Sequence, residues 1–167
     1  MLVIGVDPGT ATTGYGLIKE NADGSLAIVD YGVILTSAES SMPDRLLELH
    51  HRLNEIILLH RPEAGAVEKL FFQRNARTAI SVGQGRGVVL VSLAEARISV
   101  AEYTPLEIKQ AIAGYGGADK NQVQQMVKAL LNLPSIPRPD DAADALAVAI
   151  CHVHSARIKS LYQQAIQ

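Results

Sequence analysis

The chain opens with three apolar runs separated by turn signals, in residues 2–34: LVIGVDPGTATTGYGLIKENADGSLAIVDYGVI. Pro8-Gly9 ends the first run. Asn21-Ala22-Asp23-Gly24 marks a tight turn, because Asp-Gly readily supplies the positive φ that hairpins need. The pattern predicts strands at 2–7, 14–19 and 26–34. Three strands joined in this way form an antiparallel meander.

The rest of the chain alternates helical and extended patterns. Ser41 and Pro43 are typical of a helix start, and Arg61-Pro62 ends that helix. The predicted elements are helices at 41–60, 75–97, 105–113, 119–133 and 140–160, with strands at 64–70 and 98–103. This order predicts an α/β fold, a five-stranded mixed sheet flanked by helices on both faces. We expect a single domain over residues 1–160 and a C-terminal tail at 161–167.

Composition narrows the class of protein. The chain has 167 residues, of which 48% are hydrophobic and 19% are charged, as in an ordinary globular domain and unlike a disordered chain. No apolar run approaches the roughly 20 residues of a membrane-spanning helix. The N-terminus lacks the pattern of a signal peptide, and Cys151, the single cysteine, is expected in the core. These features predict a cytoplasmic protein.

Charge is distributed unevenly along the chain, although the net charge is only −2. Residues 1–68 hold four Lys and Arg against ten Asp and Glu, whereas residues 69–138 hold nine against four. A protein that cuts a polyanion needs a basic surface to offset its own acids. Scattered solvated charge accounts for the same pattern equally well.

Four acidic residues interrupt apolar surroundings. Asp7 ends the first strand, Glu68 follows Ala64-Gly65-Ala66-Val67, and Asp141 and Asp144 begin an Ala-rich helix. Burying an unpaired carboxylate costs several kcal/mol, so acids in such places suggest a shared cation. Two divalent ions roughly 3.5–4 Å apart would stabilise the charges that develop during phosphodiester hydrolysis. If the four acids converge, the chain is a metal-dependent hydrolase.

Each acid also has a purely structural interpretation. Asp7 before Pro-Gly suits a turn, Asp141 suits a helix N-terminus, and Asp144 suits a salt bridge. Glu68 is the hardest to explain structurally, because it follows small apolar residues in a central strand. Asp140 we assign to helix capping.

Four motifs together resemble the RuvC family of Holliday-junction resolvases. They are Val6-Asp7-Pro8-Gly9 with Thr13-Gly14-Tyr15-Gly16, Val67-Glu68 with Phe71, Gln84-Gly85-Arg86-Gly87, and Asp141-Ala142-Ala143-Asp144-Ala145-Leu146-Ala147. Any one of them alone would be weak, but their order and spacing extend the resemblance over roughly residues 1–155.

The resemblance implies a ribonuclease-H-like fold and a homodimeric endonuclease that cuts four-way DNA junctions symmetrically during recombination and repair. It implies Asp7, Glu68, Asp141 and Asp144 as catalytic metal ligands. Mg²⁺ would be the ion, two per active site with DNA bound, and Mn²⁺ would substitute. Some members carry histidine at the position of Asp141. The RuvA–RuvB branch-migration complex is the implied partner.

DNA contacts are expected near the acids. Phe71 lies three residues after Glu68, beside basic residues, and an aromatic ring there suits base stacking. By resemblance, Lys109 and Lys120 meet phosphates. Arg74, Arg77 and Arg86 are weaker candidates. Core packing is the alternative for Phe71, and a solvated surface is the alternative for each lysine. The five histidines are expected on the surface.

Three other functions share some of these features. The Asp7-Pro8-Gly9-Thr10 turn resembles the phosphate loop of actin-like ATPases, but those proteins need a second domain and a second loop. A ribonuclease-H-like nuclease acting on RNA would use the same acids. A catalytically inert binding module would have no need of all four.

Overall fold

The computed structural model describes residues 1–69 and 76–165. Its first three strands are β1 (Leu2–Asp7), β2 (Thr12–Glu20) and β3 (Leu26–Leu35), which form the predicted meander. Register pairs Asp7 with Gly14 across β1 and β2, and β3 has a bulge at Val29, opposite Leu17 and Ile18 of β2. The Asn21–Gly24 turn closes β2 onto β3, with Gly24 at a φ of 82°.

The later elements follow the predicted order with shifted ends. They are α1 (Met42–His60), β4 (Ala64–Glu68), α2 (Ala76–Glu95), β5 (Ser99–Tyr103), α3 (Pro105–Ala113), α4 (Lys120–Leu130) and α5 (Asp140–Ala165). The glycines of α2 do not break that helix. β4 is shorter than predicted, α4 ends before residue 133, and α5 continues past residue 160. Side-chain capping explains three starts, at Ser41, Thr104 and Asp119.

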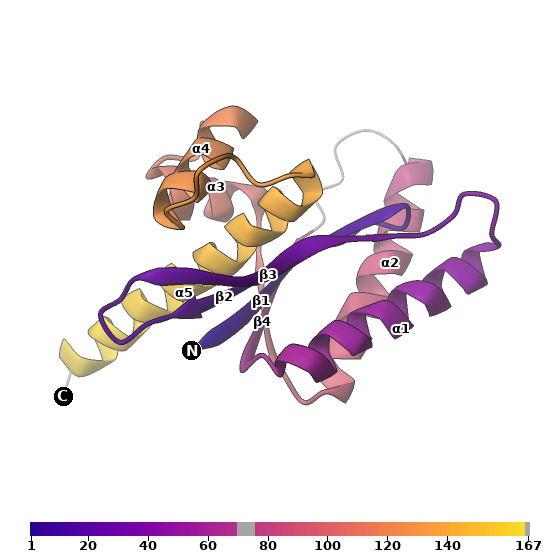
Figure 1. Ribbon diagram of the computed structural model, residues 1–167, viewed down its shortest axis with the longest axis horizontal. Coiled ribbons are helices and arrows are strands. Elements are labelled where there is room, and N and C mark those ends of the chain that lie inside the picture. Colours follow the sequence, from indigo (N-terminus) through magenta and orange to yellow (C-terminus); the bar gives the residue numbers. More distant parts are fainter. Residues whose placement is uncertain (70–75, 166–167) are drawn as a thin grey trace.

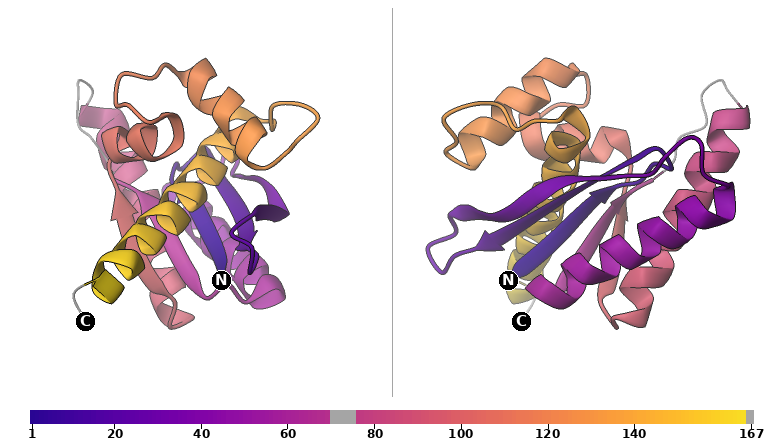
Figure 2. Two further views of the ribbon diagram at one scale, coloured as in Figure 1. Left: turned by 90° about the vertical axis from the view of Figure 1, so that its left-hand side faces the viewer. Right: turned by 45° about the vertical axis from the view of Figure 1, so that its right-hand side comes forward.

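The five strands form one mixed sheet in the order β3-β2-β1-β4-β5. The meander pairs are antiparallel, while β4 runs parallel to both β1 and β5. Helices α1 and α2 cover one face, and α5 crosses the other with α3 and α4 beside it (Figures 1 and 2). The predicted architecture is therefore confirmed.

Each face of the sheet has its own apolar core. Leucine, isoleucine and valine dominate the face under α1 and α2, through Ile4, Leu17, Leu53, Val89 and Leu93. The opposite core contains many alanines of α5, together with Cys151, which is buried as expected. None of the helices in the described part of the chain is long and apolar enough to cross a membrane.

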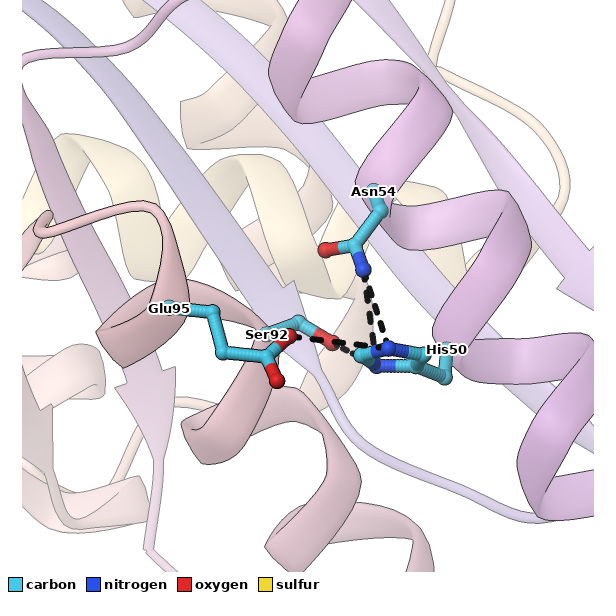
Figure 3. A network of polar contacts seen from close by, with 4 residues as sticks. All are labelled: His50, Asn54, Ser92 and Glu95. Atoms are coloured by element: carbon cyan, nitrogen blue, oxygen red, sulfur yellow. Dashed lines mark hydrogen bonds and ion pairs between the residues drawn. The ribbon is translucent and has the colours of Figure 1, made fainter.

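A polar network joins α1 to α2 above the apolar core (Figure 3). His50 Nδ1 lies 3.0 Å from the Oγ of fully buried Ser92, and His50 Nε2 lies 3.1 Å from Asn54 Nδ2 and 3.5 Å from Glu95 Oε2. The expectation that all histidines lie on the surface is wrong. Only His51 is exposed, because the other four find hydrogen-bonding partners on other elements: Ser92, Asp30, Tyr103 and Ala111.

Candidate active site

Two of the four acids meet because β1 and β4 are parallel neighbours. Val6 pairs with Val67, so Asp7 and Glu68 lie side by side at the carboxyl ends of the two strands. Side chains alternate between the two faces along a strand. Gly5 and Ala66, which lie two positions before Asp7 and Glu68, face α5. Asp7 and Glu68 therefore point to the α5 face, and their carboxyl groups hydrogen bond to each other.

Glycines bring α5 against this strand end. A Cβ atom at Gly14 would lie 2.0 Å from the carbonyl oxygen of Asp141, and one at Gly5 would lie 2.2 Å from that of Ala145. Both distances are far below any tolerable contact, so only glycine permits this approach of helix and strand. Since Gly14 is the cross-strand partner of Asp7, the first turns of α5 carry Asp141 and Asp144 to the same place.

The acids perturb one another strongly. Burial raises the pKa of Asp7 to about 8, assisted by the charge of Glu68, the hydrogen bond with Glu68, and the charges of Asp144 and Asp141. Burial also raises the pKa of Asp144, although Lys120 opposes that shift. Glu68 has a raised pKa for the same primary reason, burial. Perturbation of this kind, from desolvation and like charges together, marks candidate functional sites.

The donor set suits a hard divalent cation, since carboxylate oxygens are the ligands that Mg²⁺ and Mn²⁺ prefer. Within residues 1–69 and 76–165, no three Asp, Glu, His or Cys side chains are already arranged as a complete ligand group. The ammonium group of Lys120 nevertheless supplies one positive charge among the acids. Lys120 Nζ lies 3.0 Å from Asp144 Oδ2. The residues therefore match a metal in charge and chemistry, and their side chains must adjust to surround one.

A cavity of about 200 Å³ adjoins the acids between α3, α4 and α5. Two acids, Glu68 and Asp144, and two lysines, Lys109 and Lys120, line it. Its remaining wall is apolar, formed by Pro105, Ile108, Val123, Ala147 and Val148. Both lysines that the sequence singled out thus lie beside the acids, where an anionic group would meet positive charge.

The other predicted DNA contacts are only partly placed. Phe71 and Arg74 lie outside the described residues. Arg77 belongs to the first turn of α2, and its side chain is likewise outside the described part. Arg86, in contrast, forms an ion pair with Glu102 of β5 on the opposite face of the sheet from the acids.

Asp140 has contacts that its predicted capping role does not account for. Its carboxylate pairs with Lys120 through Oδ2, at 3.4 Å, and with Arg138 through Oδ1. Sequence reasoning missed this function because Lys120 lies twenty residues away and on another helix. A charge-complementary pair at that separation leaves no local signal.

Comparison with known proteins decides the family. The family model for crossover junction endodeoxyribonuclease RuvC matches residues 3–152. The chain belongs to the RuvC family. RuvC of Syntrophomonas wolfei is 54% identical over 98% of this chain and 94% of its own length, and RuvC of a Roseiflexus species is 59% identical over 92% and 90%. These relatives are crossover junction endodeoxyribonucleases, and the family is one of metal-dependent nucleases.

Solved structures of RuvC proteins agree in shape. Thermus thermophilus RuvC superimposes with a TM-score of 0.89 at 39% identity, covering 95% of this chain and 97% of that chain. The same protein in complex with a Holliday-junction substrate gives a TM-score of 0.87 at 37% identity, covering 95% and 96%. The yeast mitochondrial resolvase Ydc2, at 15% identity and a TM-score of 0.67 over 95% of this chain and 82% of its own, shares the fold alone. The predicted ribonuclease-H-like fold is confirmed.

Proposed function

We propose that this protein resolves four-way DNA junctions by cutting two strands symmetrically in a metal-dependent phosphodiester hydrolysis, during homologous recombination and DNA repair. The main observation in support is the structural likeness, over 95% of the chain, to a RuvC protein bound to a Holliday junction. A nuclease of the same fold acting on RNA would use the same acids. The comparisons favour DNA, since the RuvC relatives are named as endodeoxyribonucleases.

We assign the metal site to Asp7, Glu68, Asp141 and Asp144. Support comes from their convergence on one strand end and from the raised pKa of Asp7, which burial causes first and the neighbouring acids increase. The ion we assign is Mg²⁺, with Mn²⁺ as a substitute and two ions per site once DNA is bound. When bound, such ions stabilise the attacking and leaving oxygens and lower the pKa of the attacking water. Asp7 must give up its proton to act as a ligand.

Substrate binding we assign to different side chains. Lys109 and Lys120 border the acids, line the same cavity and would contact phosphates. Phe71 would stack on a base near the crossover, with Arg74 and Arg77 adding positive charge. This division predicts that loss of an acid removes chemistry while junction binding remains.

We further propose a homodimer, because two cuts in one junction require two active sites. RuvA–RuvB is the proposed partner complex, inferred from family membership. A cytoplasmic location is the inference that suits a DNA-acting enzyme with one buried cysteine.

The test is cleavage of synthetic four-way junctions with Mg²⁺. We expect paired nicks at symmetric positions, with ends that a ligase can join. A linear duplex and an RNA–DNA hybrid of the same sequences serve as controls. Equal cutting of the linear duplex, or preference for the hybrid, would overturn the proposal. Sedimentation at the working concentration checks the dimer.

A further inference from the structure

Lys120 is shared by two acids of α5 that differ in their surroundings. Asp140 and Asp144 lie four residues apart, so they occupy neighbouring positions on one face of the helix. The ammonium of Lys120 spans them, 3.0 Å from Asp144 Oδ2 and 3.4 Å from Asp140 Oδ2. Lys120 is the first residue of α4, whose N-terminus Asp119 caps firmly, so the lysine extends from a rigid base.

Asp140 and Asp144 differ in where they lie and in which groups they contact. Asp144 lines the same cavity as Glu68, so it belongs to the acid cluster. Asp140 is not among the residues that line that cavity, and its side chain is 42% exposed against 31% for Asp144. Its carboxylate pairs with Arg138 through Oδ1 and with Lys120 through Oδ2. Arg138 thereby orients Asp140 and leaves the second oxygen toward Lys120. Asp140 is thus a partner of the lysine and lies outside the proposed ligand set.

A divalent cation at Asp144 would compete with Lys120. Both are positive and both require the same carboxylate, so the ammonium must leave Asp144 Oδ2 when the cation arrives. A released lysine in water regains the rotamer freedom of its long side chain, and ordering it again on the substrate phosphate carries an entropic penalty. The contact with Asp140 offers the Lys120 ammonium a second carboxylate partner close to the first.

We propose that Asp140 is a positioning residue that retains Lys120 at the edge of the active site when a divalent cation occupies Asp144, so that the lysine meets the substrate phosphate already placed. This inference rests on the proposed metal site and on the proposed phosphate contact of Lys120. It assigns to Asp140 a function that depends on Lys120, and that dependence makes it testable.

A double-mutant cycle on junction cleavage tests the coupling. Asp140→Asn should lower kcat about 5-fold with little change in KM when Lys120 is present. In a Lys120→Ala background the same substitution should change kcat less than about 2-fold, because no lysine remains to be positioned. Equal loss in both backgrounds would overturn the proposal. Asp140→Glu, which keeps the charge, should restore most of the rate. Glu55→Gln, on the exposed face of α1, is the matched control for loss of one negative charge.

A second readout needs no DNA and no turnover. With Mg²⁺ saturating, the NMR order parameter of the Lys120 ammonium should be high in the unchanged protein and fall in Asp140→Asn. Equal order in both would overturn the positioning function. Mg²⁺ titration of Asp144→Asn separates the two proposals: unchanged affinity there would overturn the metal site itself, whereas weakened affinity supports it and leaves the cycle to decide on Asp140.

Discussion

The helices pack on the two faces of the sheet in different ways. Under α1 and α2, large side chains such as Leu53, Val89 and Leu93 separate helix from sheet, and a polar network closes the top of the interface. Under α5, glycines of the strands and alanines of the helix leave almost no separation. The first face stabilises through apolar burial. The second uses close backbone approach to hold four carboxyl groups within reach of one another, an arrangement that lowers stability and places groups for chemistry.

The largest expected effect lies at the acid cluster itself. Asp7→Asn should reduce junction cleavage by at least about 1000-fold, because a carboxylate ligand becomes an amide that cannot offset the charge of a cation. Junction affinity in a gel-shift assay without cleavage should change little, since we assign binding to the lysines and Phe71. Loss of affinity by a protein with an unchanged circular dichroism spectrum would contradict this division.

Close packing under α5 is tested by adding a single methyl group. Gly14→Ala should destabilise the protein by about 3 kcal/mol, because the new Cβ would lie 2.0 Å from the Asp141 carbonyl oxygen. It should also lower cleavage by up to about 100-fold by displacing Asp141 and Asp144. Denaturant melts and single-turnover rates measure the two effects.

The matched control is Gly87→Ala in α2. A Cβ there meets no atom within 4 Å, so the substitution should stabilise the protein by about 0.5–1 kcal/mol. If both variants had similar melting temperatures, the contrast between the two faces would be wrong.

A smaller effect is expected on the pH dependence of stability and of metal binding. The pKa of Asp7 is raised from 3.8 to about 8, so the folded, metal-free protein holds a proton that the unfolded chain has lost over that range. Stability of the metal-free protein should therefore fall as pH rises from about 4 to about 8. This dependence should be weaker in Asp7→Asn, where Glu68 and Asp144 remain as groups with a raised pKa. At pH 7, Mg²⁺ binding should release about one proton, which calorimetry in buffers of different ionisation enthalpy measures. Absence of proton release would contradict the assignment of Asp7.

The smallest expected effect on cleavage lies on the α1–α2 face. His50→Ala removes the partner of the buried Ser92 hydroxyl and should cost about 1–2 kcal/mol of stability. Cleavage per folded molecule should stay within about 2-fold of the unchanged protein. A chemical melt and an active-site-normalised rate check this, and a large loss of rate would show that the two faces are coupled.

Much of the architecture could be predicted from local patterns. The apolar runs and the Asp-Gly turn predicted the meander correctly, because tight turns and strand alternation depend on neighbouring residues. Element ends were less accurate: α5 continues to Ala165, since an exposed helix needs no strong stop signal where its packing ends. The histidines were misjudged because their partners, such as Ser92 for His50, lie on other elements.

Residue type alone was enough to single out Asp7, Glu68, Asp141 and Asp144, since carboxylates in apolar surroundings are anomalous wherever the chain goes. Their meeting depends on the tertiary structure: a parallel β1–β4 register and the approach of α5 over Gly5 and Gly14. The same holds for Asp140, whose sequence position indicates a cap and whose spatial position makes it the partner of Lys120. Local patterns report the free energy of placing one residue in an environment, whereas charge pairing across twenty or more residues exists only once the chain is folded.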